Sequence, residues 1–81
     1  MESEIEDVVE ILENLQNDSS VPKNVKEKMA TSIHALKEET ETSIKVNKAM
    51  HELEEIADDP NLESYARTQI WNVVSALEKI A

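Results

Sequence analysis

The stretch DDPNLESYARTQIW, residues 58–71, marks the junction between two predicted helices. It gathers the only arginine, tyrosine and tryptophan of the 81-residue chain and one of its two prolines. Asp59 or Asn61 can cap the helix that follows the junction, because a short polar side chain accepts a hydrogen bond from a free N–H group of the first turn. A proline at the start of a helix loses no hydrogen bond. The stretch therefore predicts a capped helix junction rather than an active site.

Outward from this junction, apolar residues recur with the 3.6-residue period of amphipathic helices. The pattern predicts helices over about residues 2–17, 21–37, 42–57 and 62–80. Residues that favour helices are abundant and glycine is absent, which disfavours the tight hairpins of β-rich proteins. The fold class is therefore predicted to be all-α. The apolar stripes consist of Ile5, Val8, Val9, Leu12 and Leu15; Val21, Val25, Met29, Ile33 and Leu36; Val46, Ala49, Met50, Leu53 and Ile56; and Leu62, Ala66, Ile70, Val74 and Leu77.

The other two helix boundaries differ in strength. Ser20 is the predicted N-cap of the second helix, and Pro22 falls in its first turn. The break between the second and third helices, at EETET (residues 38–42), is weaker, because glutamate tolerates helix and only Thr40 and Thr42 favour a cap. A continuous helix through residues 37–42 is the alternative.

The two halves of the chain match when the sequence is shifted by 41 residues. The four apolar stripes then coincide pairwise, Asp18 coincides with Asp59, and the candidate caps Ser20 and Asn61 coincide as well. We therefore expect a single domain of two helical hairpins, about 1–39 and 42–81, closed into a four-helix bundle. The period is near that of HEAT-type repeats, so a two-repeat HEAT-like stack is the alternative.

Charge and composition exclude several classes of function. The formal net charge of -10 repels phosphate backbones, so we expect no direct nucleic-acid binding. No apolar run approaches the roughly 20 residues of a membrane span, and the acidic start MESEIEDVVE is unlike a signal peptide. The chain has no cysteine, which suits a cytoplasmic protein and excludes thiolate metal sites.

Three motifs carry a resemblance to a known family. They are VPKN at residues 21–24, DDPN at 58–61, and ARTQIW at 66–71 followed by VVSALEKI at 73–80. Residues 21–80 resemble a family of short archaeal proteins of unknown function, catalogued as an uncharacterised protein family. The resemblance implies a small all-helical bundle from an archaeal cytoplasm. It implies no catalytic residue or cofactor.

A metal-binding or enzymatic bundle is the alternative function. His51 stands one turn before Glu54 and Glu55, so an imidazole and a carboxylate can share a ligand. A di-iron bundle needs Glu-x-x-His on two helices, however, and Thr31 and Lys48 occupy the glutamate positions. The chain has neither a glycine-rich phosphate loop nor a nucleophile elbow. We expect no enzymatic activity and no cofactor.

Two surfaces are candidates for binding a protein partner. Residues 1–22 hold seven acidic residues and no basic one, so Glu6, Glu10 and Glu13 form either a solvated helix face or a docking face for a basic protein. Tyr65, Arg67 and Trp71 form either an intramolecular anchor or a binding patch, since these are the commonest hot-spot residue types. We expect a non-catalytic, small acidic protein that acts in protein–protein interaction, with a basic protein or a second copy of itself as partner.

Overall fold

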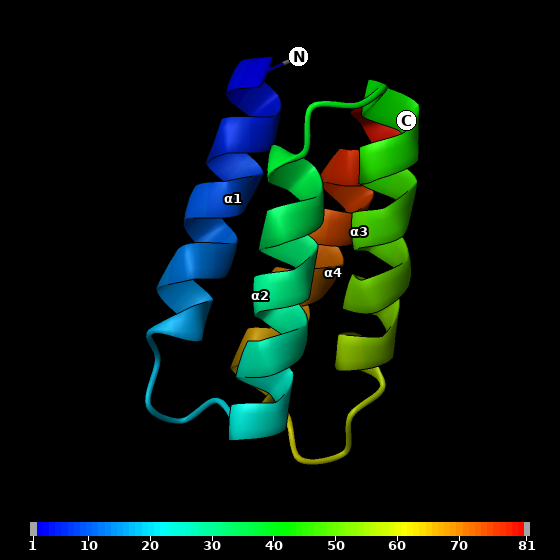
Figure 1. The fold of residues 1–81 in the computed structure, drawn as a ribbon. Helices are drawn as coiled ribbons and strands as arrows, with labels where there is room; N and C mark the ends of the chain where they lie inside the picture. The colour runs from blue at the N-terminus through cyan, green and yellow to red at the C-terminus, as the bar shows by residue number, and fades with distance from the viewer. Residues whose placement is uncertain (1, 81) are drawn as a thin grey trace.

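The computed structural model describes residues 2–80 and contains four helices in that range, without strands. They are α1 (Glu2–Gln16), α2 (Lys23–Lys37), α3 (Thr42–Ala57) and α4 (Ser64–Ile80). Successive helices run in opposite directions, and α4 lies behind the other three in Figure 1. The prediction of an all-α fold is confirmed.

The helices pack in a closed ring. The backbones that lie close together are those of α1 and α2, α2 and α3, α3 and α4, and α4 and α1, while the diagonal pairs meet only through core side chains. A stack of two hairpin repeats would instead place equivalent helices of the two hairpins side by side, α1 against α3 and α2 against α4. The molecule is therefore an antiparallel four-helix bundle, and the HEAT-like alternative is wrong.

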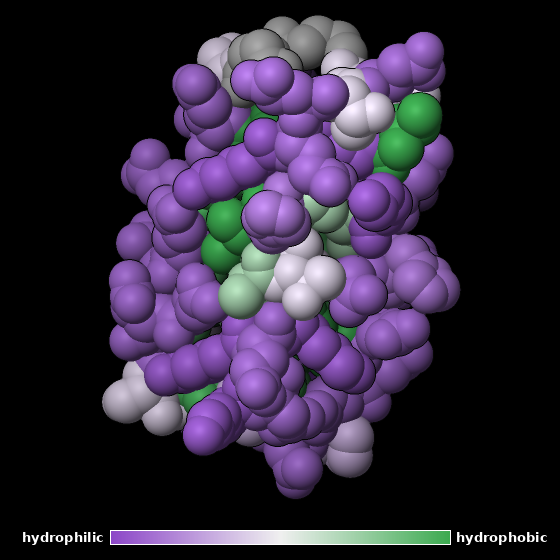
Figure 2. All heavy atoms as spheres, viewed as in Figure 1, coloured by the Kyte–Doolittle hydropathy of each residue, from purple (hydrophilic) through white to green (hydrophobic). Residues whose placement is uncertain are grey.

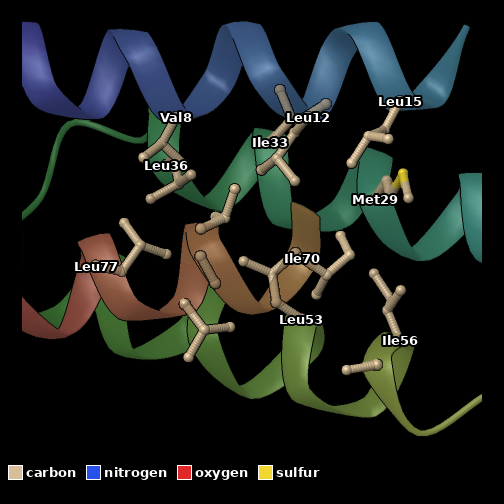
Figure 3. Close-up of a cluster of buried hydrophobic side chains, with 14 of the residues drawn as sticks. Val8, Leu12, Leu15, Met29, Ile33, Leu36, Leu53, Ile56, Ile70 and Leu77 are labelled. Carbon is tan, nitrogen blue, oxygen red and sulfur yellow. The ribbon is translucent and has the colours of Figure 1, made fainter. Parts of the chain in front are cut away.

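The core consists of the four predicted stripes. Figure 3 shows side chains from all four helices meeting at its centre, among them Leu12, Leu36, Leu53 and Ile70. Every predicted stripe residue is buried except Met50, which is only partly buried against the core. Burying one such side chain contributes about 1.5–3 kcal/mol. The common core is therefore the main source of stability.

The two hairpins share a turn whose hydrogen bonds repeat at the 41-residue spacing. The backbone N–H of Ser20 donates to the Asp18 carboxylate at 2.9 Å, and the backbone N–H of Asn61 donates to the Asp59 carboxylate at 2.9 Å. In each case the aspartate side chain closes a local turn onto the backbone two residues later. The internal repeat read from the sequence is therefore a repeat of turn geometry too.

These turns correct the predicted helix caps. Ser20 is not an N-cap: α2 has Pro22 in the extended N-cap position without a side-chain cap bond. The Ser20 hydroxyl instead donates to Asp18 at 2.8 Å. Asp59 and Asn61 likewise lie in the loop before α4, which begins at Ser64. The polar residues thus bond within the loops, and α2 begins without a side-chain cap.

A true break separates α2 from α3, so the alternative of a continuous helix is wrong. Glu38 and Glu41 both adopt extended backbone angles, with ψ of 147° and 140°. The Lys48 ammonium donates to the Glu38 carboxylate at 3.0 Å and thereby lowers the pKa of Glu38. No residue between 2 and 80 has a positive φ, so the connections are made without the conformation that glycine favours.

Truncation of a core isoleucine is expected to destabilise the bundle strongly. Ile70→Ala should lower the free energy of unfolding by about 2–5 kcal/mol, because Ile70 is fully buried. The matched control is Ile44→Ala, since Ile44 is 48% exposed and should change stability by less than about 0.5 kcal/mol. Urea denaturation of both variants measures the difference. Equal losses would contradict the burial described here.

The Asp18 turn predicts a contribution to stability that depends on pH. Hydrogen bonds from the Ser20 backbone N–H and hydroxyl hold the pKa of Asp18 below its ordinary value of 3.8. Because the folded-state pKa is lowered, the contribution is present above pH 3.8 and is lost as the pH falls through the folded-state pKa. Asp18→Asn should therefore show a smaller loss of stability between pH 6 and pH 3 than the wild type in urea denaturation. The control Asp7→Asn, an exposed substitution in α1, should keep the wild-type pH dependence.

Candidate protein-interaction surface

The outward face of α4 carries no free charge over four turns. Between residues 64 and 77 the only charged side chain is Arg67, although 32% of the chain is charged. By contrast, the side of the molecule formed by α1, α2 and α3 is mostly hydrophilic, with only limited apolar surface between the helices (Figure 2). We name the uncharged surface the α4 face; it consists of Ser64, Tyr65, Thr68, Trp71, Asn72 and Ser75, which are exposed, and Gln69, which is half-buried.

The two aromatic residues of the chain lie on this face. Tyr65 is 60% exposed and Trp71 is 44% exposed. The interpretation in which Trp71 fills the interior of the bundle is therefore wrong. Six residues of helix correspond to a rotation of about 600°, so the two side chains leave α4 about 120° apart. They mark the two flanks of the α4 face rather than one aromatic cluster.

Tyr65 borders a hollow between α4 and α1. The hollow has a volume of about 160 Å³ and is lined by Tyr65 and Gln69 from α4 and by Ile11, Asn14 and Leu15 from α1. Ile11 is 36% exposed and was missed as a candidate. The sequence could have indicated Ile11, because it is an isoleucine outside the apolar stripe of its helix and therefore does not face the core.

Arg67 has a structural role in the junction before α4. Its guanidinium donates to the carbonyls of Ala57 at 2.9 Å, Asp59 at 2.8 Å and Leu62 at 3.0 Å. Of the two roles predicted for Arg67, an intramolecular anchor or part of a binding patch, its three bonds to backbone oxygens agree with the first. Because the carbonyls at the end of a helix lack partners within it, Arg67 satisfies the end of α3 and fixes the loop.

The first hairpin contains a counterpart of this contact. The Gln16 side chain donates to the carbonyl of Lys26 at 3.2 Å. Residues 16 and 26 lie 41 positions before Ala57 and Arg67, so the same pair of positions is joined in both hairpins with the donor exchanged. The Arg67 contact is therefore part of the repeated turn, and Arg67 is half-buried there rather than free to meet a partner.

The acidic candidates all lie on the surface of α1. Glu6, Glu10 and Glu13 are exposed, and their spacing of four and three residues places them on one side of the helix. The Glu13 carboxylate pairs with the Lys37 ammonium at 3.4 Å, so this side borders α2. An exposed pair of this kind contributes only about 0–1 kcal/mol. The three glutamates form an acidic surface distinct from the α4 face.

The histidine of the alternative function lies apart from a ligand set. His51 is 74% exposed at its side chain and its Nε2 lies 3.3 Å from the carboxylate of Glu55, not of Glu54. Within residues 2–80, no three His, Asp or Glu side chains gather closely enough to hold a metal ion. Among the residues the structure describes, the carboxylate next to His51 is that of Glu55, one turn along the exposed surface of α3.

Two further hollows lie elsewhere on the bundle. One, of about 630 Å³, is open between the start of α1 and the loop after α2, where Glu6 and Lys45 are among its lining residues. The other, of about 390 Å³, lies between α2 and α3 beside Thr31 and His51. The first is lined mainly by glutamate, lysine and aliphatic side chains. In the second, the Thr31 hydroxyl donates to the Glu27 carbonyl at 3.3 Å, and the Nε2 atom of His51 lies 3.3 Å from the Glu55 carboxylate, so the hydroxyl and the imidazole each have another neighbour. They do not suggest a reaction.

The fold and its surfaces define a small antiparallel four-helix bundle protein with an acidic helix and an uncharged helix face. This chain belongs to the Uncharacterised protein family (UPF0147), whose model matches residues 1–80. The resemblance carried by the VPKN, DDPN and ARTQIW motifs is thereby confirmed.

Archaeal relatives and a crystal structure agree with this assignment. The UPF0147 protein of Archaeoglobus fulgidus is 38% identical over 95% of this chain and 88% of its own length. The relative from Pyrococcus horikoshii is 38% identical over 99% of this chain and 88% of its own. The crystal structure of the unknown function protein MMP1188 matches with a TM-score of 0.90 at 34% identity, covering 96% of this chain and 90% of that chain. No helix within residues 2–80 is long and apolar enough to cross a membrane.

Removal of the Arg67 guanidinium is expected to destabilise the second hairpin. Arg67→Met keeps the apolar stem but removes three hydrogen bonds of a charged donor, so the free energy of unfolding should fall by at least about 2 kcal/mol. Gln16→Met is the matched control in the first hairpin and should cost about 1 kcal/mol, because it removes one neutral hydrogen bond. Urea denaturation compares the two. An Arg67→Met variant as stable as the wild type would contradict the structural role.

Proposed function

We propose that this protein is a non-catalytic interaction protein that binds another protein through the α4 face. The observation that carries the proposal is the exposure of both aromatic side chains, Tyr65 and Trp71, on the one long helix surface without free charge. Tryptophan and tyrosine are among the residues that most often dominate the binding energy of protein interfaces. A charge-poor centre with aromatic residues is the composition that distinguishes interface cores from ordinary surface.

The repeat supports this proposal, because it supplies an internal comparison. The residues equivalent to Tyr65 and Trp71 in the first hairpin are Asn24 and Ala30, both exposed on α2. The bundle therefore folds with a polar or small residue at these positions in one hairpin, and its packing does not require aromatic ones in the other. Trp71 leaves 44% of its surface in water, and burial of this apolar area against a partner is the simplest reason for its presence.

The acidic side of α1 supplies a second element of the proposal. Glu6, Glu10 and Glu13 would attract a basic protein and steer its approach, since charge at the edge of an interface acts mainly on the association rate. The net charge of -10 makes a nucleic acid a poor direct partner. We propose a cytoplasmic setting, with which the absence of cysteine agrees.

Capture of partners from a lysate of the source cells tests the proposal. The bait is compared with a Tyr65→Ser/Trp71→Ser double variant, and the matched control is Ile44→Ser, which removes an exposed apolar side chain from α3. We expect a protein retained by the wild type and by the control but reduced at least about 10-fold with the double variant, as for loss of a hot spot. Circular dichroism should show the same helix content in all baits, since the altered side chains lie outside the core.

Salt separates the contributions of the two surfaces. A partner guided by α1 should be captured less at 0.5 M than at 0.05 M salt, and a Glu6→Gln/Glu10→Gln/Glu13→Gln variant should remove that dependence. Equal capture of every partner by the wild type and by the double aromatic variant would move the interface away from α4 and overturn the proposal.

A further inference from the structure

We infer that the α4 face binds the α4 face of a second copy of this chain, in an antiparallel pair about a two-fold axis. The inference rests on the proposed function, because it names the first partner of the same surface. A second copy bound there would cover the two aromatic side chains, Tyr65 and Trp71, that are exposed in the single chain. Two properties of the chain favour a second copy as the partner: the distribution of charge over the surface, and the order of large and small side chains along α4.

Charge restricts where two copies can meet. Each copy carries a net charge of -10, so contact through an acidic surface such as that of α1 would place like charges together. On α4, residues 64–77 include no acidic side chain, and their one cation, Arg67, is directed at the carbonyls of Ala57, Asp59 and Leu62. Neighbouring helix axes lie about 8–10 Å apart, and the Debye length at physiological salt is about 8 Å, so salt weakens the repulsion that the acidic residues of α1 exert on a copy bound at α4.

Large and small side chains are ordered along α4 so that they fit together when two copies of the helix run antiparallel. Tyr65 and Ser75 are ten residues apart, which is about 15 Å of helix. An antiparallel pair with its axis at the level of residue 70 therefore places the large Tyr65 of each copy opposite the small Ser75 and Ala76 of the other. Such self-complementarity is what a two-fold interface requires.

Trp71 falls next to the axis in this arrangement. Because it lies one residue from the centre, the two Trp71 side chains leave their helices on the same side of the pair and meet each other there. Paired aromatic rings add about 0.5–1.5 kcal/mol beyond the area they bury. Thr68 lies at the middle of the face, where its small side chain allows the helices to approach closely.

The order along α4 also predicts a response to charge at Asn72, which is exposed and two residues from the axis. In a two-fold pair each Asn72 lies near the Asn72 of the other copy. A charge introduced at residue 72 would therefore lie near the same charge of the other copy. Because like charges repel, Asn72→Glu and Asn72→Lys should both weaken the pair. A basic partner would respond differently, since Asn72→Glu would strengthen its binding and Asn72→Lys would weaken it.

Sedimentation equilibrium of the full chain tests the inference. A contact of one helix from each copy buries less than the roughly 800 Å² per partner of a standard interface, so concentrations from about 10 to 500 μM are appropriate. We expect a monomer–dimer equilibrium for the wild type and at least a 10-fold higher dissociation constant for both Asn72 variants. Asn47→Glu and Asn47→Lys, the same changes at an exposed position of α3, should leave it within about two-fold of the wild type.

The fluorescence of the single tryptophan gives an independent readout of the same equilibrium. Trp71 emission should shift to shorter wavelength as the wild type is concentrated, because the indole leaves water, and should not shift in Asn72→Lys. A wild type that stays monomeric at 500 μM, or a dimer insensitive to Asn72, or a dimer changed in opposite directions by the two Asn72 variants, would overturn the inference. Capture of a different protein that depends on Tyr65 and Trp71 would in that case leave the proposed function standing.

Discussion

Burial of the four apolar stripes in one common core is the interaction on which the rest of this structure depends. The chain has 81 residues without cysteine or glycine, so it has neither disulfides nor flexible turns to supplement a small core. Only a closed ring of helices covers each stripe with two neighbours. The ring in turn determines which helix surfaces face outward, and hence that the α4 face and the acidic side of α1 are separate surfaces.

The two junctions inside the hairpins are variants of one device. In both, an aspartate side chain closes the loop onto the backbone two residues later, and a long side chain joins the end of one helix to the start of the next. The second junction replaces the single bond of Gln16 by the three bonds of Arg67. A guanidinium has five donors in fixed geometry, so it can bond to more carbonyls at once than a side-chain amide can. The crowding of scarce residues in DDPNLESYARTQIW thus combines a structural arginine with two exposed aromatics.

Membership in the UPF0147 family extends the architecture to archaeal relatives, and the similarity to the MMP1188 crystal structure extends it at 34% identity. Neither comparison assigns an activity. What indicates a function is instead the difference between the surfaces of the two hairpins of this chain. The core positions repeat, whereas the surface positions differ: α1 is acidic, and the α4 face carries two aromatic side chains and no charged one. The packing of the repeated core does not require these surface differences. We therefore expect a partner to bind where the two hairpins differ.

The sequence alone determined the fold class, the four helices to within a few residues, and nearly all of the core, because the 3.6-residue period of apolar residues is a local property of the chain. It also determined that Asp18 and Asp59 occupy equivalent turns. Tertiary structure decided that the helices close into a bundle, since both candidate arrangements bury the same stripes. It also decided that Trp71 is exposed while Arg67 is held in the loop. Those outcomes depend on the distances between α3, α4 and the loop that joins them, and a pattern along one helix cannot specify what its neighbours cover.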